Sequence, residues 1–326
     1  MSKAERSCSS CLSLASCVLA WLCVGPTRAH DGAGLSARDW THSWTPNLWL
    51  FALLGGASLL YLQGRRAQRR ARRADHAPRQ LENAAFVLSL LTLLFALASP
   101  LDRLSDLTFS AHMAQHELLM LLAAPLLVLA RPLPTYLRAL PAPARLGIAR
   151  LLRQPVALAS FRFLTAPLVA LLLHGLVRWL WHIPALFEAA LADEWVHGVQ
   201  HASFFLTALL FWWGLVHGRY GRAGYGLSFL FVLLTAMHTG ALGALLSFSE
   251  HAWYPTYRAR SQPLELDPVF DQQVAGLIMW VGAGLWMMLL ALALFLAWLG
   301  EARRRSERGS LAALARRAHR EGAAAP

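Results

Sequence analysis

The sequence predicts an all-α protein, a polytopic membrane helix bundle with seven transmembrane helices after a cleavable signal peptide. Composition is the first observation behind this fold class. Hydrophobic residues make up 56% and charged residues only 15% of the chain, with a mean hydropathy of +0.42, a balance typical of membrane proteins. Apolar runs long enough to cross a bilayer as helices are the second observation. The third is that arginines gather in short segments between those runs.

The positive charge is best explained by membrane topology. A formal net charge of +12 is compatible with nucleic-acid binding, but the arginines follow the positive-inside pattern of cytoplasmic loops. No basic stripe alternates with aromatic residues, as binders of single strands require. We therefore expect a lipid bilayer, and no nucleic acid, as the surroundings of this chain.

The amino-terminal segment has the features of an export signal. A basic start precedes an apolar core at 11–24 and a small-x-small cleavage site that ends at Ala29. We expect a signal peptide at 1–29 and a periplasmic segment at 30–46. All four cysteines precede residue 24. Cleavage would therefore exclude disulfides and thiolate metal sites.

The first three expected spans are residues 47–63, 84–101 and 110–130. Tryptophans near the start of the first span suit the outer interface, and six arginines directly after it place the next loop in the cytoplasm. The second span returns outward through a short loop, and the third goes back in. The start of the third span should therefore lie at the outer surface.

Residues 131–162 connect the third span to the fourth on the inner side. Prolines and arginines alternate there with apolar residues, which fits either an amphipathic helix on the inner leaflet or a solvated basic loop. The fourth and fifth spans, 163–183 and 196–217, are joined outside by a short segment. That segment is either an interfacial helix or an extension of the fifth span.

The last two spans are residues 225–248 and 271–299, separated by the largest outer loop. Four arginines directly after residue 299 hold the following tail, 300–326, in the cytoplasm. The spans together form a membrane domain at 47–299. We expect a multi-pass protein of the bacterial inner (plasma) membrane with a periplasmic amino terminus and a cytoplasmic carboxyl terminus. No internal repeat supports an inverted-repeat transporter.

Five histidines gather at the outer ends of three spans. His112 and His116 are four residues apart, as are His197 and His201, so each pair lies on one helix face. His182 ends the fourth span at the same depth. Polar groups in a membrane are costly and are functional candidates by default. We interpret the five as one metal site, provided that their helices are neighbours; the alternative is a set of interfacial histidines bonded to water and neighbouring helices.

An imidazole-rich site without thiolates suits copper, zinc or iron. Met113 points off the face of the first pair and is a weak candidate for a soft ligand. The arginine one turn from both His174 and His182 can neutralise an acidic group or reach outward to the interface. Asp271 also suits the cap of its own helix. The residues predicted to support the metal ligands are Gln115, Glu117, Arg178, Asp271 and Gln272.

Two further histidines, His174 and His238, lie near the expected midplane of the membrane. They fit either hydrogen-bonded core histidines or an axial ligand pair for haem, and a quinone near Arg178 is a related alternative. The sequence shows no catalytic triad, phosphate loop or carboxylate pair, and we expect no enzyme.

Four motifs resemble the CtaG family of caa3-type cytochrome c oxidase assembly factors. They occur in the family's order, and the similarity runs over about residues 47–299. Where the family is expected to have an acidic residue before the second histidine of the fifth span, this chain has Gln200. The motifs are His112-Met113-Ala114-Gln115-His116, Trp181-His182-Ile183-Pro184-Ala185-Leu186, His197 to His201, and Asp271-Gln272-Gln273-Val274-Ala275-Gly276-Leu277-Ile278-Met279-Trp280.

The resemblance implies an inner-membrane protein needed to build the oxidase, which handles copper at the periplasmic face. Our hypothesis is an assembly factor that binds copper through the five outer histidines and delivers it to cytochrome c oxidase subunits. A periplasmic copper chaperone is a further candidate partner. The alternatives are a haem- or quinone-binding membrane redox protein and a metal-free structural scaffold for oxidase assembly.

Overall fold

The computed structural model describes residue 44 and residues 47–71, 80–218 and 224–323 of the chain. The predicted signal peptide lies outside the described residues. Within them every regular element is a helix, which confirms the all-α fold class. The first half comprises α2 (Leu48–Ala71), α3 (Gln80–Ala98), α4 (Pro100–Leu107), α5 (Phe109–Glu117), η2 (Leu118–Ala123), α6 (Ala124–Ala130), α7 (Leu133–Ala139), α8 (Ala142–Leu152) and α9 (Pro155–Leu164).

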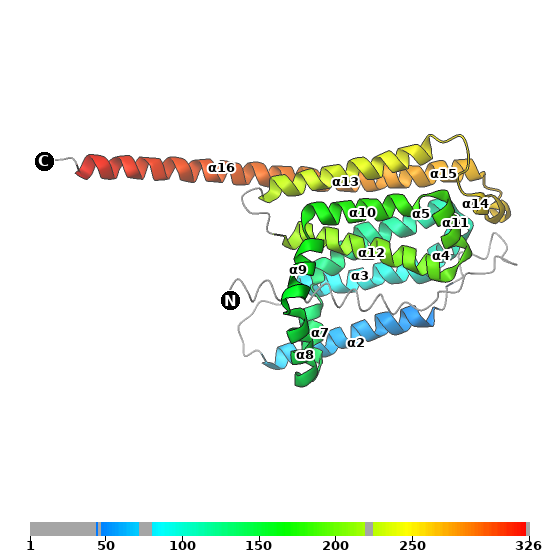
Figure 1. Ribbon diagram of the computed structural model, residues 1–326, viewed down its shortest axis with the longest axis horizontal. Helices are drawn as coiled ribbons and strands as arrows, with labels where there is room; N and C mark the ends of the chain where they lie inside the picture. Colours follow the sequence, from blue (N-terminus) through cyan, green and yellow to red (C-terminus); the bar gives the residue numbers. More distant parts are fainter. Residues whose placement is uncertain (1–43, 45–46, 72–79, 219–223, 324–326) are drawn as a thin grey trace.

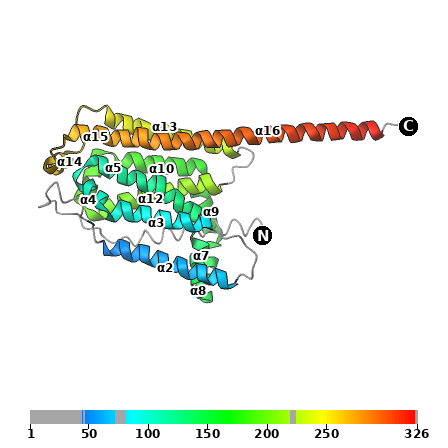
Figure 2. The ribbon, with the colours of Figure 1, turned by 180° about the vertical axis from the view of Figure 1, so that it is seen from behind.

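The second half comprises α10 (Pro167–Trp181), α11 (Pro184–Ala192), α12 (Glu194–His217), α13 (Gly224–Ser247), α14 (Pro255–Arg260), η3 (Gln262–Leu264), α15 (Pro268–Leu277), η4 (Ile278–Gly282) and α16 (Ala283–Ala323). The long helices lie side by side, and α7, α8 and α9 cross one end of the bundle (Figure 1). The short helices α4, α11 and α14 lie at the other end, and α16 projects beyond the bundle (Figure 2).

Five of the described helices or helix runs are long and apolar enough to cross a membrane: Gln80–Ala98, Phe109–Ala130, Glu194–His217, Gly224–Ser247 and Pro268–Arg303. A sixth forms if α9 and α10, which meet at 66°, are counted as one span. The predicted first span falls within α2, which does not meet the same test. The structure therefore supports a membrane protein with five or six candidate spans, against seven predicted.

The third span is helical throughout but widens in the middle. Its π-helical segment η2 ends two residues before Pro125, which has no N–H to donate to the carbonyl four residues earlier. A π-turn accommodates such a break, and π-turns are frequent at functional sites. The segment begins directly after Glu117, the last residue of α5. The π-turn therefore sits immediately beside the polar residues of the candidate site.

The short connection before this span is helical, so the expectation of a loop there is wrong. The hydroxyl of Ser99 accepts the N–H of Leu101 and caps α4, and Pro100 occupies its first turn. Both residues are ordinary helix-start signals. Thr108 ends α4 and caps α5, because its hydroxyl accepts the N–H of Ala111. The turn between these two helices sets the direction in which α5 enters the bundle.

The hydrophobic core surrounds α12, which packs against α6, α10 and η2. Phe204 and Phe205 are fully buried, and the indole N–H of Trp212 donates to the carbonyl of Met120 at 2.8 Å. Such a helix, apolar on most of its faces, is expected in the middle of a bundle. Because α12 is central, His197 and His201 near its amino terminus lie close to α5.

The helices α13 and α15 approach each other closely through glycines. A Cβ added to Gly243 would lie 2.7 Å from the carbonyl oxygen of Gly276, and one added to Gly276 would lie 2.5 Å from that of Gly243. Small residues permit this kind of backbone contact between membrane helices. The contact holds α15 in the bundle, where it packs on α5.

Candidate metal centre

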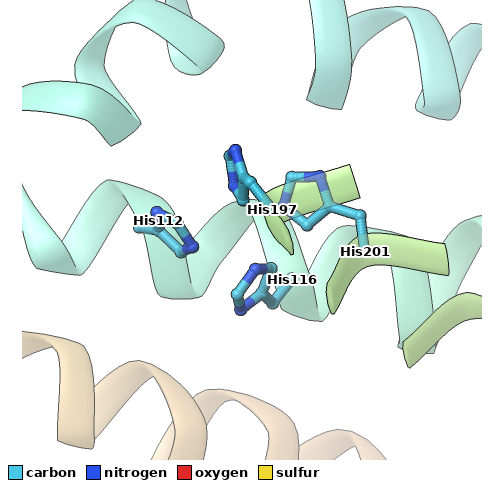
Figure 3. Close-up of side chains that lie close together, drawn as sticks. All are labelled: His112, His116, His197 and His201. Carbon is cyan, nitrogen blue, oxygen red and sulfur yellow. The ribbon is translucent and has the colours of Figure 1, made fainter. Parts of the chain in front are cut away.

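Two helices point their histidine pairs at each other (Figure 3). Ring centroids lie 4.4 Å apart for His112 and His116 on α5, and 4.2 Å apart for His197 and His201 on α12. Between the helices, His112 lies 5.2 Å from His197 and His116 lies 4.9 Å from His201. The structure thus brings four of the five predicted ligands into one group.

The spacing of the donor atoms fits one metal ion. One ring nitrogen from each of the four histidines lies within 4.8 Å of the other three. A tetrahedral ion with metal–nitrogen bonds of 2.0–2.1 Å needs nitrogens about 3.3 Å apart. The rings therefore need to approach each other by at most about 1.5 Å, which side-chain rotation can supply.

The imidazoles of this group are buried without enough hydrogen-bond partners. His112 and His116 are each 1% exposed and His201 is 7% exposed. Among the described residues, no partner reaches Nε2 of His112, His197 or His201, or either ring nitrogen of His116. A buried polar atom without a partner costs about 1–3 kcal/mol, so several at one point indicate a ligand.

A tyrosine on α14 determines which ring nitrogen of His112 carries the hydrogen. The hydroxyl of Tyr257 on α14 donates to the carbonyl of Ser105 at 3.0 Å and lies 2.8 Å from Nδ1 of His112. Because a hydroxyl has one hydrogen, both contacts are satisfied when Nδ1–H of His112 donates to the tyrosine oxygen. Nε2 then keeps its lone pair for a metal. Burial also raises the pKa of Tyr257 well above its usual value, which keeps the phenol protonated.

Aromatic rings cover the four histidines on the side of α11 and α14. Phe187 of α11 lies 5.2 Å from His112 and 4.2 Å from Tyr254, measured between ring centroids. Phe109 packs against both Phe187 and Tyr254. These rings limit access of water to the group, and a low dielectric strengthens electrostatic interactions inside it.

Comparison with known proteins identifies the family. The family model described as cytochrome c oxidase caa3 assembly factor matches residues 59–301 of this chain. The chain belongs to that family. This confirms the resemblance inferred from the four motifs, two of which supply the four histidines described above.

Two curated relatives of this assembly-factor chain are uncharacterized proteins of Mycobacterium bovis and Mycobacterium tuberculosis. Each is 26% identical over 276 residues. The alignment covers 80% of this chain and 41% of each relative, so the chain spans about two fifths of their length. No solved structure matches this chain.

The fifth predicted ligand, His182, lies beside the group of four and contacts a different partner. Its Nδ1 lies 2.7 Å from the carbonyl of Arg178 and donates to it, because a carbonyl can only accept. Its Nε2 lies 3.4 Å from Sδ of Met113. Two atoms with lone pairs therefore face each other. Met113, which points away from the histidine pair on α5, faces His182 instead.

Glu117 and Arg178 form a buried ion pair, with Nη1 of Arg178 2.6 Å from Oε1 of Glu117. The arginine is 1% exposed and also contacts Sδ of Met120. The bonded oxygen of Glu117 therefore contacts an arginine and not an imidazole. One residue after His116, its side chain is rotated by about 100° around α5 and faces α10. Arg178 neutralises an acidic group and does not reach to the interface.

Gln115 and Gln272 form hydrogen bonds that hold together the segments around the four histidines. The amide nitrogen of Gln115 donates to the carbonyl of Ala96 at 2.7 Å and to Asp102 at 2.8 Å, which ties α5 to α3 and α4. The amide oxygen of Gln272 accepts the backbone N–H of Trp253, and its amide nitrogen donates to the carbonyl of His251. Gln200, on the same face as His197 and His201, is fully buried, and neither amide atom has a hydrogen-bond partner among the described residues.

Asp271 caps a different helix from the one expected. Its carboxylate accepts the backbone N–H groups of Phe109 at 2.6 Å and Ser110 at 3.1 Å, at the start of α5. Asp267 caps its own helix, α15. A carboxylate at a helix amino terminus satisfies free N–H groups and the helix dipole. Asp271 thus fixes the helix that bears His112 and His116.

His174 and His238 lie deeper in the bundle. Nδ1 of His174 lies 3.2 Å from the hydroxyl of Thr207, and the ring of His238 packs 3.4 Å from the Cβ position of Gly175. The cavity beside Arg178 has a volume of about 10 Å³. That space suits about one water molecule and is far smaller than a haem or a quinone.

Proposed function

We propose that this protein binds a copper ion through His112, His116, His197 and His201 and passes it to a subunit of cytochrome c oxidase during assembly. The main support is the group of buried imidazole nitrogens without partners, which lie at a spacing suitable for one metal ion. The membership of the caa3 assembly-factor family supports the oxidase as the recipient. The ion is cargo in this proposal, and the protein acts as a carrier and not as an enzyme.

The donor set favours copper among the metals that imidazole can bind. Affinity for nitrogen donors rises along the first-row divalent metals to a maximum at copper. A thioether and an imidazole, as in Met113 and His182, suit copper(I) in particular. We assign Met113 and His182 as an additional copper-binding position beside the four histidines. His182 thus keeps its predicted role as a metal ligand. A periplasmic copper chaperone is the candidate donor of the ion.

Topology in this proposal places the metal centre at the periplasmic side of the bacterial inner membrane. The arginine-rich end of α2 and the carboxyl end of α16 lie at the end of the bundle opposite to α4, α11 and α14 (Figure 1). Positively charged segments stay in the cytoplasm. The membrane domain at 47–299 then delivers copper outward, and the tail at 300–326 stays inside.

Metal analysis of the purified protein tests the copper centre. The wild type should retain about one copper per chain after dialysis, as expected for a four-ligand site. The double variants His112→Gln with His116→Gln, and His197→Gln with His201→Gln, should each lose it. His251→Gln is the matched control, because His251 is exposed on the outer segment. Equal copper in all four proteins contradicts the proposal.

Oxidase assembly in cells separates the carrier from a metal-free scaffold. A quintuple His→Gln variant that includes His182 should fail to support an active oxidase although it reaches the membrane in normal amount. Added copper should rescue the activity in part if delivery is the missing step. Full oxidase activity with the quintuple variant would establish the scaffold function in place of the copper function.

A further inference from the structure

A long apolar groove lies between α2 and α3, away from the histidines. Its volume is about 580 Å³, within the range of about 300–1,000 Å³ that holds medium-sized ligands. Its walls are almost entirely apolar, with Phe51 and Leu54 on α2 and Val87 and Leu91 on α3. In both views α2 lies at the edge of the bundle, next to α3 (Figures 1 and 2).

The groove exists because α2 is attached to the bundle at one end. A Cβ added to Gly64 would lie 1.9 Å from the carbonyl oxygen of Thr135, so α2 touches the backbone of α7 there. The amide of Gln68 donates to the hydroxyl of the same threonine at 3.0 Å. Near its other end, Gly55 has open space around its Cβ position although it lines the groove.

The apolar part of the groove has the length of one lipid leaflet. From Phe51 to Leu62 a helix rises about 16 Å, close to the roughly 15 Å that is half of a bilayer's hydrocarbon core. Tyr61 and Phe86 stack at 3.9 Å between ring centroids and form the floor at its polar end. Leu62, Val87 and Leu91 are all more than half exposed, so the groove opens to the lipid.

Cationic and polar groups gather at the end of the groove next to Leu62. Arg65 and Arg69, one turn apart on α2, line this end together with Asn83. Asn83 accepts the hydroxyl of Tyr61 at 2.9 Å through its Oδ1, which leaves its amide nitrogen as a donor. Arg65 bonds the neutral Gln68. Among the described residues, neither arginine is within ion-pair distance of an acidic side chain, and Glu82 does not line the groove.

We propose that this groove binds one anionic phospholipid, with an acyl chain along the apolar walls and its phosphate between Arg65 and Arg69. The charge at one end and the apolar length at the other match the two parts of such a lipid. A transmembrane helix of a partner is too wide for this volume, because a helix with side chains is about 10–12 Å across. The proposal does not rest on copper binding.

Lipid titration of the full-length protein tests the headgroup contact. Native mass spectrometry with phosphatidylglycerol should show that Arg65→Gln with Arg69→Gln weakens binding about 30-fold, at about 1 kcal/mol per arginine and 1.4 kcal/mol per tenfold. Arg66→Gln with Arg70→Gln is the matched control, because these arginines lie on the same helix but do not line the groove. It should change binding less than threefold.

Filling the groove tests the acyl-chain contact. Gly55→Leu should remove the bound lipid, because the new side chain occupies the groove without a clash at Cβ. Gly56→Leu is the control, since Gly56 also has open space but does not line the groove. The thermal midpoint of each variant, measured in the same detergent without lipid, should stay close to that of the wild type.

Three results would overturn the proposal. Equal losses in both arginine pairs would show general attraction to charge, and equal retention of phosphatidylcholine would show that the anion is not recognised. Displacement by millimolar inorganic phosphate would show a site for free phosphate without an acyl chain. Retention of phosphatidylglycerol by the wild type and by both controls, together with its loss from both groove variants, supports the lipid site.

Discussion

Replacing Tyr257 with phenylalanine removes a single oxygen atom that joins α14 to the group of four histidines. That oxygen donates to the carbonyl of Ser105 and accepts from Nδ1 of His112. Both partners are buried, as is the tyrosine, which is 2% exposed. The phenylalanine ring keeps the packing against Phe109 and Phe187, so the change is limited to two hydrogen bonds.

The expected effect on copper affinity follows from the role of this hydroxyl. Loss of the group that orients a metal-bound histidine costs about 10–100-fold in affinity, or about 1.4–2.8 kcal/mol. His112 can then rotate, and its ring can present the other tautomer to the metal. Without metal, each of the two buried groups left unpaired should lower the free energy of unfolding by about 1–3 kcal/mol.

Competition of the purified protein with a copper chelator measures the affinity directly. Tyr254→Phe is the matched control, because Tyr254 is a buried tyrosine of the same aromatic group whose hydroxyl donates to the carbonyl of His182 at 2.9 Å. Both variants should lose similar stability, but only Tyr257→Phe should lose copper affinity. Equal affinity of both variants and the wild type would refute the assignment of Tyr257 as the group that orients His112.

Three other predictions concern stability, measured as the thermal unfolding midpoint in detergent. Burial, and then the neighbouring Asp102, raise the pKa of Asp106 to about 7, so its contribution to stability is present below pH 4 and is lost as the pH rises through 7. The thermal midpoint of Asp106→Asn should therefore be higher than that of the wild type at pH 8, and the difference should be smaller at pH 5. Midpoints that change in parallel with pH would contradict this. Glu117→Gln should cost about 3–5 kcal/mol because it leaves Arg178 as an unpaired buried charge, and adding Arg178→Gln should recover most of the loss; no recovery would place the cost elsewhere. Gly243→Ala should cost about 1–3 kcal/mol, because its Cβ meets the backbone of α15, whereas Gly284→Ala, which has open space, should be nearly neutral.

Local features of the candidate site were predictable from the sequence. The histidine pairs share a face because a helix turns about 100° per residue wherever it packs. The start of α4 was also predictable from Ser99 and Pro100, although a loop was expected there. The capping residue and the proline that follows it are enough to predict α4, because they act on the nearest backbone groups.

The sequence did not show which helices are neighbours. Tyr257 is 145 positions from His112, and Asp271 is 162 positions from Phe109, and no local pattern links such residues. The same holds for Glu117 and Arg178, where the partner of each depends on the rotation of α5 against α10. His182 was expected with the other histidines, but it ends α10 one turn after Arg178 and bonds back to its carbonyl.

The sequence alone determined that this protein is a helical membrane protein with two histidine pairs, because composition and helical period are local properties of the chain. Only the tertiary structure decided that α5 and α12 face each other, that Tyr257 and Asp271 hold the first pair, and that α2 leaves a groove. Close backbone contacts at Gly64 and Gly243 set the positions of α2 and α15. They depend on how whole helices fit together, which no single segment specifies.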